Sequence, residues 1–152
     1  MIKNIILIFL FFAFASTASA KQIKISSDKL EILRKENISI FSGNVYAYEE
    51  GLEIWSEKLT VTSSDDERTI NKIDALDNVK ILRQNLMING NEALYDPIKN
   101  TLTVIGKVNI VQNENIILCD KIIVDLENSS SIMVSDSTKR VEALIISEDK
   151  IR

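Results

Sequence analysis

Three acidic residues recur at matching places in this sequence and could in principle supply paired carboxylates for acid–base chemistry. They are Glu57, Glu92 and Asp120. Each stands at the same position of a phrase that recurs along the chain, so the repeat itself accounts for their recurrence. A charge that points into an apolar core costs several kcal/mol unless it is paired. We therefore predict a bulge or bend that turns each acid outward, with catalysis as the alternative.

The other reactive side chains offer little chemistry. Histidine, the usual general base and the commonest metal ligand, does not occur in the sequence. Cys119, the only cysteine, lies in an apolar stretch, which is typical of a packed side chain rather than a nucleophile. The run of acids from Asp65 to Glu67 has no ligand of a second type nearby and is typical of a solvated loop. The sequence therefore predicts neither an enzyme nor a metal site, and no cofactor.

Two short phrases repeat along the chain and position these residues. The first contains Val45, Val79 and Val108, which are 34 and 29 residues apart. The second phrase sets a small or polar residue, an acid, a variable residue and an aliphatic in order. Its versions are Ser27–Leu30, Ser56–Leu59, Asn91–Leu94 and Cys119–Ile122. Two interleaved phrases with one rhythm indicate an array of strand pairs.

Alternating apolar residues predict strands through most of the chain. From Leu102 to Ile110 every second residue is aliphatic except Gly106, which is the pattern of a half-buried strand. The expected strands are one or two within residues 21–33, then 38–48, 52–62, 70–82, 86–95, 101–111, 116–126, 132–135 and 141–147. The pattern indicates an all-β sandwich, barrel or solenoid.

Glycines hold a fixed register in two of these strands. Gly43 and Gly106 each precede a repeated valine by two residues, and Gly90 precedes one version of the second phrase. A glycine weakens the interior of a strand, so the position must gain something from the missing side chain. A bulge or crowded corner would explain it, and room for a ligand beside the sheet is the compatible alternative.

The first twenty residues have the organisation of a secretory signal. Lys3 is their only charge, an apolar run covers residues 5–14, and Ala18, Ser19 and Ala20 provide the small residues of a cleavage site. We expect cleavage before Lys21, which leaves one domain over residues 21–152. An uncleaved membrane anchor is the alternative.

Charge and cysteine content exclude several classes of protein. Because Lys3 is the only charge lost from 18 basic and 22 acidic residues, the expected mature chain has a net charge of −5. This weakly acidic balance argues against binding to nucleic acid and against a polybasic grip on anionic lipid. A single cysteine cannot form an internal disulfide, so sheet pairing and apolar burial must hold the fold.

Four stretches carry a family resemblance, namely Phe41–Val45 and Gly106–Val108 of the first phrase and Ser56–Leu59 and Cys119–Ile122 of the second. They resemble the LptA/OstA-like family of periplasmic proteins. The resemblance extends from about residue 25 to residue 126, and the repeat fades after Ser131. It implies an open, twisted β-jellyroll with an apolar interior. It further implies a carrier that shields the acyl chains of lipopolysaccharide (LPS) and connects inner-membrane LptC-like with outer-membrane LptD-like β-jellyroll domains. The resemblance also implies that copies of the chain stack head to tail.

The residues themselves support an apolar trough. A strand array with one aliphatic face must bury that face against itself or against an apolar guest, and about ten buried methylenes contribute on the order of 8 kcal/mol gross. We expect the trough to stay accessible along its length. The candidate lining residues are Phe41, Val45, Ile54, Leu59, Val79, Ile81, Ile88, Leu94, Leu102, Val104, Val108, Ile110, Leu118 and Val124.

Three readings compete with a free periplasmic carrier. Two are the membrane-anchored LptC-like component and the N-terminal domain of the outer-membrane translocon, which share the fold. The third is a non-enzymatic β-solenoid scaffold with a dry, filled core. Unpaired edges at both ends of an open array would favour stacking. The charges of Lys21, Lys24 and Lys29 at one end, and of Arg140, Glu142 and Glu148 at the other, could guide it.

Overall fold

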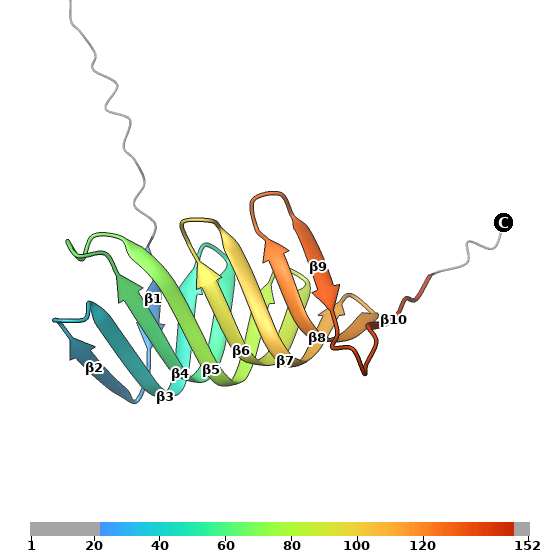
Figure 1. Ribbon diagram of the computed structural model, residues 1–152, viewed down its shortest axis with the longest axis horizontal. Helices are drawn as coiled ribbons and strands as arrows, with labels where there is room; N and C mark the ends of the chain where they lie inside the picture. Colours follow the sequence, from blue (N-terminus) through green and yellow to red (C-terminus); the bar gives the residue numbers. More distant parts are fainter. Residues whose placement is uncertain (1–21, 148–152) are drawn as a thin grey trace, which may run out of the picture.

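The computed structural model describes residues 22–147, which form one antiparallel sheet of ten strands (Figure 1). The strands are β1 (Lys24–Ser26), β2 (Lys29–Leu33), β3 (Ile38–Glu49), β4 (Leu52–Ser63), β5 (Ile70–Arg83), β6 (Leu86–Asp96), β7 (Thr101–Gln112), β8 (Asn115–Asp125), β9 (Ser130–Val134) and β10 (Glu142–Leu144). From β3 to β8 each strand pairs with the next along the chain. The predicted all-β fold is confirmed, and the ends of β3 to β8 lie within one residue of the sequence prediction. The signal segment lies outside the described residues.

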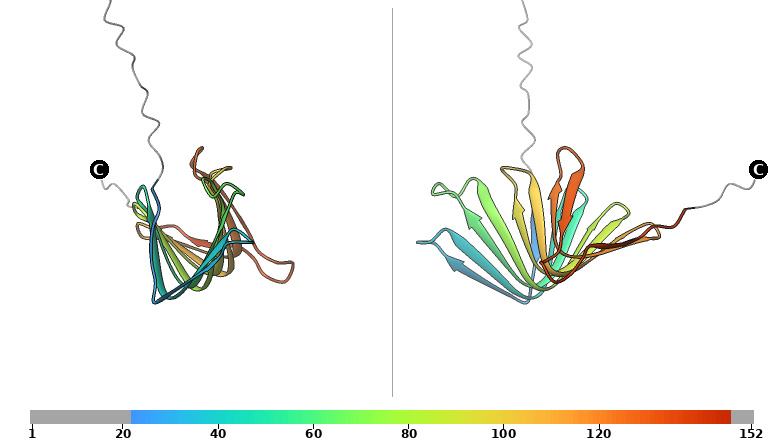
Figure 2. Two further views of the ribbon diagram at one scale, coloured as in Figure 1. Left: turned by 90° about the vertical axis from the view of Figure 1, so that its left-hand side faces the viewer. Right: turned by 45° about the vertical axis from the view of Figure 1, so that its right-hand side comes forward.

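The sheet is folded along its length into a V (Figure 2). Each strand from β3 to β8 bends near its middle, where the register with a neighbour shifts. One arm of the V, here called the first arm, contains β2, β9, the first halves of β3, β5 and β7, and the second halves of β4, β6 and β8. The second arm contains β1, β10 and the remaining halves. Apolar side chains of both arms meet between them.

Two kinds of corner make the bends. In β3, β5 and β7 the corner contains two consecutive residues with positive φ, namely Gly43–Asn44, Asp77–Asn78 and Gly106–Lys107. The side chains on either side of such a corner keep their alternation, as Val104 and Val108 do. In β4, β6 and β8 the inward positions change from one parity to the other across the corner, as from Ile54 to Leu59. These bulged corners confirm the bend predicted beside the repeated acids.

The short terminal strands keep the same plan. β1 and β2 together make one bent strand with Asp28 at its corner, where the Asn44 amide donates to Asp28 at 2.9 Å. β9 and β10 make the last bent strand, whose corner expands to residues 135–141. The backbone N–H of Asp136 donates to Asp120 at 2.9 Å, and the ammonium of Lys139 lies 3.5 Å from the same carboxylate. The repeat therefore continues past Ser131, in a widened form that the sequence pattern did not show.

Candidate functional site: the groove between the arms

The inner walls of the V are built from rows of side chains that run across the strands. On the second arm, a row of isoleucines with one alanine faces inward: Ile25, Ala47, Ile54, Ile81, Ile88, Ile110 and Ile117. On the first arm, the facing row contains Val61, Ile73, Tyr95, Leu102 and Val124. The rows come from all the long strands, so they form one continuous apolar cluster.

Most of the predicted lining residues face this interior. Eleven are buried in the cluster: Val45, Ile54, Leu59, Val79, Ile81, Ile88, Leu102, Val104, Val108, Ile110 and Val124. Phe41 is half-buried and packs against it. Their burial gives their position in the fold, whereas contact with a lipid remains a proposal.

Leu94 and Leu118 were predicted to line the interior, and this assignment is wrong. Leu94 pairs with Asp74 and Thr103 on the outer face, and Leu118 is 44% exposed there. The corners of β6 and β8 cause the error, because each has one residue fewer than the corner of the preceding strand, and the parity that points inward changes there. Beyond each bulge the alternation seen in the sequence therefore leads to the wrong face.

The same reversal hid several interior residues from sequence reasoning. Ala93, Cys119 and Ile122 are buried in the cluster although none was among the predicted lining residues. The packed state predicted for Cys119 is confirmed, and burial raises the pKa of its thiol. A shift of the second phrase by one residue in β6, so that Ala93 aligns with Leu59 and Ile122, would have given the correct face for that strand.

The repeated acids do not form a paired-carboxylate site. Glu57 and Asp120 lie at bulged corners of β4 and β8, which are four strands apart, or roughly 19 Å at normal strand spacing. In β6 the residue at the equivalent corner is Asn91, so Glu92 lies one residue further along, on the outer face. Burial raises the pKa of the Glu92 carboxyl, and the nearby Asp74 carboxylate raises it further. Glu92 is thus a surface group beside one other acid.

The groove is filled in its middle and open at its C-terminal end. A residual space of about 10 Å³ remains in the middle, against Leu52, Ile88 and Leu102. A cavity of about 380 Å³ lies between the arms at the end formed by β7 to β9. Its apolar lining consists of Leu86, Ile110, Ile117, Ile122, Val124, Leu126, Met133 and Ile145. The expected accessibility along the whole trough is therefore corrected to accessibility at this end.

Two polar side chains lie at the open edge of the groove, at the ends of strands and away from the corners. Glu49, at the end of β3 on the second arm, is only 7% exposed, and Tyr95, on β6 of the first arm, is 4% exposed. Burial raises the pKa of Tyr95 to about 12, and the adjacent Glu49 carboxylate adds to the increase, whereas Arg83 opposes it. Because the two residues belong to opposite arms, their contact spans the groove. No motif or spacing in the sequence pointed to this pair.

An open, V-shaped β-jellyroll with an apolar groove and an unpaired strand edge at each end defines the class of this protein. The model of the family described as "LptA/(LptD N-terminal domain) LPS transport protein" matches residues 24–130. This match covers more than half of the sequence. The chain belongs to that family, as its resemblance to LptA/OstA-like proteins predicted.

Solved structures support the fold independently. The chain is similar to LptH from Pseudomonas aeruginosa, described as the LptA-homologous periplasmic component of the lipopolysaccharide transport device, with a TM-score of 0.74 and 13% sequence identity. The similarity covers 84% of this chain and 96% of that one. Comparison with curated proteins finds no match.

Two further features bear on the possible functions. Within residues 22–147, no helix has the length and apolar character needed to cross a membrane. In the same part of the chain, no group of three or more Cys, Asp or Glu side chains is arranged to hold a metal ion.

Proposed function

We propose that this protein is a periplasmic LPS carrier that shields lipid A acyl chains in its groove and bridges the inner and outer membranes. The observation that carries the proposal is the continuous apolar interior, which opens into a cavity of about 380 Å³ at one end. Ligand pockets commonly have volumes of about 300–1,000 Å³. Membership of an LPS transport family supports the same conclusion.

The cavity is large enough for part of one chain, so a lipid with several chains requires the arms to part. The ladder hydrogen bonds run within each arm, and the arms are joined covalently only at the corners. Opening therefore breaks side-chain packing between the arms and leaves the sheet intact. An acyl chain that enters replaces the lost packing with equivalent apolar contacts.

Unpaired edges at both ends support bridging. At the N-terminal end, Leu30 and Ile32 of β2 are 50% and 57% exposed. At the C-terminal end, Ile132 of β9 and Leu144 of β10 are 65% and 59% exposed. Such edges pair readily with another strand. We propose that they bind LptC-like and LptD-like β-jellyroll domains, or further copies of this chain head to tail, with residues 1–20 directing export as a cleaved signal.

A photo-crosslinking amino acid at Ile117 tests lipid carriage. Ile117 lines the cavity, whereas its neighbour Leu118 lies on the outer face and provides the matched control. Protein labelled in cells should yield an LPS adduct from Ile117 and little from Leu118. Products confined to the protein itself at both positions would exclude carriage and favour the β-solenoid scaffold.

The state of the N-terminus distinguishes the carrier from an anchored component. Mass spectrometry of the exported protein should give a chain that starts at Lys21. A chain that keeps residues 1–20 would instead favour the LptC-like alternative.

The oligomeric state tests the edges. Light scattering should detect assembly that depends on concentration, and reversal of the charges of Lys24 and Lys29 should change the size of the oligomer. An unchanged size would exclude charge-guided stacking.

A further inference from the structure

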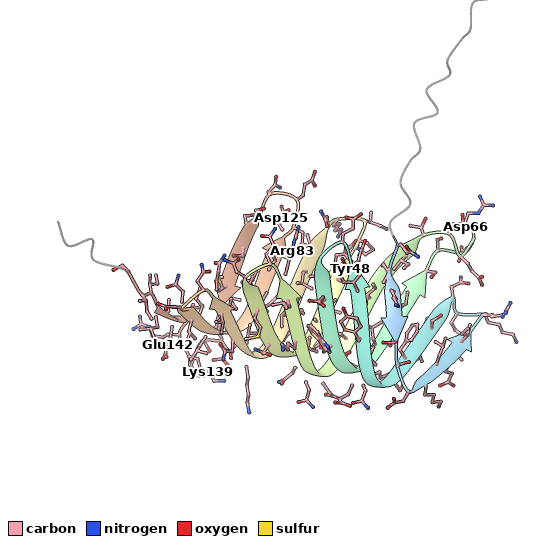
Figure 3. The ribbon with its side chains drawn as sticks, turned by 180° about the vertical axis from the view of Figure 1, so that it is seen from behind. Tyr48, Asp66, Arg83, Asp125, Lys139 and Glu142 are labelled. Carbon is pink, nitrogen blue, oxygen red and sulfur yellow. The ribbon has the colours of Figure 1, made fainter. Side chains whose placement is uncertain are left out.

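Arg83 is a charged residue placed on the inner side of an otherwise apolar wall. It is the last residue of β5 and pairs with Leu52 of β4 and Leu86 of β6, both of which line the groove. Arg83 itself lines both the small central space and the larger C-terminal cavity. Figure 3 shows it at the open edge of the V, as it does Asp125. Arg83 is half-buried at the mouth of an apolar cavity, so its charge is only partly hydrated and an anionic partner would stabilise it.

No acid within residues 22–147 provides that partner at ion-pair distance. The ion pairs in this part of the chain are formed by Lys29, Lys72 and Lys139, so no carboxylate oxygen lies within 4.0 Å of the Arg83 guanidinium. Glu49 and Arg83 both lie close enough to Tyr95 to shift the pKa of its hydroxyl, in opposite directions. Glu49 nevertheless forms no ion pair with Arg83. The guanidinium therefore keeps donors available for a ligand.

Asp125 is the acid that lines the same cavity, and residues of its own loop donate hydrogen bonds to its carboxylate. One carboxylate oxygen accepts hydrogen bonds from the backbone N–H groups of Glu127 and Asn128, both at 3.0 Å. The other oxygen accepts one from the Asn128 side-chain amide at 2.8 Å. These bonds hold the pKa of Asp125 below its usual value. The carboxylate is thus committed to the turn between β8 and β9 and does not neutralise Arg83.

The rest of the cavity is divided between an apolar floor and a polar rim. Ile117, Val124 and Met133 belong to the floor, while Gln112 and Ser130 belong to the rim. Apart from Arg83 and Asp125, the rim side chains are uncharged hydrogen-bonding groups. A ligand that fits has a hydrocarbon chain for the floor and an anionic group that reaches Arg83.

We propose that Arg83 determines specificity at this mouth by binding the anionic head, phosphate or carboxylate, of an amphiphile whose acyl chain occupies the cavity. This inference rests on the proposed function, because it concerns the same groove. Guanidinium binds both oxyanions through two parallel hydrogen bonds, and its charge does not titrate in the physiological range. The cavity thereby distinguishes anionic from neutral lipids of equal chain length.

The test measures the affinity of the purified full chain for three lauroyl probes by isothermal titration calorimetry. The probes are lauric acid, lauroyl lysophosphatidic acid and monolaurin, which carry a carboxylate, a phosphate and an uncharged head. For Arg83→Gln we expect a loss of about tenfold or more for both anionic probes, with unchanged affinity for monolaurin. Arg83→Lys should recover part of the loss, because it restores the charge without the planar fork. A loss for one anionic probe only would identify the head group that the site takes.

Arg68→Gln is the matched control, because Arg68 is an exposed arginine in the loop after β4 and does not line the cavity. It should leave all three affinities unchanged. Equal affinity of the wild-type protein for all three probes would overturn the proposal, as would an equal loss for monolaurin in both Arg83 variants. Failure of this test leaves the LPS adduct at Ile117 as a separate readout, so it does not by itself refute the proposed carrier.

Discussion

The replacement Gly106→Ala probes the corner that forms the V. Gly106 has φ +88°, in the left-handed region, and an added Cβ would lie 2.5 Å from Asn91 Nδ2 and 3.0 Å from Asn91 Cβ. The substitution therefore has two costs. The left-handed backbone costs an alanine about 1–2 kcal/mol. The forced contact with the corner of β6 costs on the order of 1–3 kcal/mol more.

Gly51 provides a matched control for the first of these costs. It has φ +83°, and nothing lies within 4 Å of an added Cβ. Gly51→Ala should therefore lower the free energy of unfolding by about 1–2 kcal/mol, and Gly106→Ala by about 2–5 kcal/mol. The difference between the two variants measures the packing of one corner against the next.

Urea denaturation monitored by Trp55 fluorescence is a suitable assay. Trp55 is the only tryptophan, and it contacts Tyr46 and Lys80 on the outer face, so its emission reports the folded sheet. In a double-mutant cycle, Gly106→Ala should lower the free energy of unfolding much less in the Asn91→Gly background than in the wild type. The reason is that Asn91→Gly removes the side chain that an added Cβ at position 106 would meet. Equal losses in Gly51→Ala and Gly106→Ala, without coupling to Asn91, would refute close packing of the corners.

Two further predictions concern the interior. Tyr95→Phe should make the stability of the protein less sensitive to high pH. In the folded wild-type protein the pKa of Tyr95 is raised from 10.0 to about 12. The contribution of its neutral hydroxyl to stability is therefore complete below pH 10 and is lost as the pH rises through about 12. The wild-type urea midpoint should thus fall over this range by more than that of Tyr95→Phe, and parallel curves would contradict the burial of this hydroxyl. Leu59→Ala should destabilise the protein by about 2–5 kcal/mol, because Leu59 is fully buried. Leu118→Ala should cost about 1 kcal/mol or less, and thermal unfolding that gives equal losses would contradict the assignment of faces.

The strands were predictable because each follows a period of two and ends at polar turn residues. Residues 101–111, for example, were expected to form a strand, and β7 spans Thr101–Gln112. The direction in which a side chain points was predictable only as far as the nearest corner. Leu102 and Val108 of β7 keep one parity and were assigned correctly, whereas Leu94 lies beyond a bulge and was not. A bulge is fixed by pairing with a neighbouring strand, which local alternation does not reveal.

The polar residues of the groove were harder to predict for a different reason. Arg83 and Glu49 are charged residues at the ends of strands, where a charge usually marks a solvated turn. Whether such a side chain leans inward depends on the register of the hairpin and on the opposite arm. Tyr95 on that arm is 46 residues from Glu49 in the sequence, and no periodic signal connects them.

The alternation of the two kinds of corner explains how strands that all bend build one apolar interior. A left-handed pair preserves the parity of β3, β5 and β7, whereas the corners of β4, β6 and β8 have one residue fewer and change parity, so every strand presents apolar side chains to the same side of the bend. Water cannot replace the contacts between the arms without exposing this surface, which costs about 25 cal/mol per Å². Hydrocarbon can replace them at little net cost. In the proposed carrier, the filled middle therefore excludes water while it yields to acyl chains.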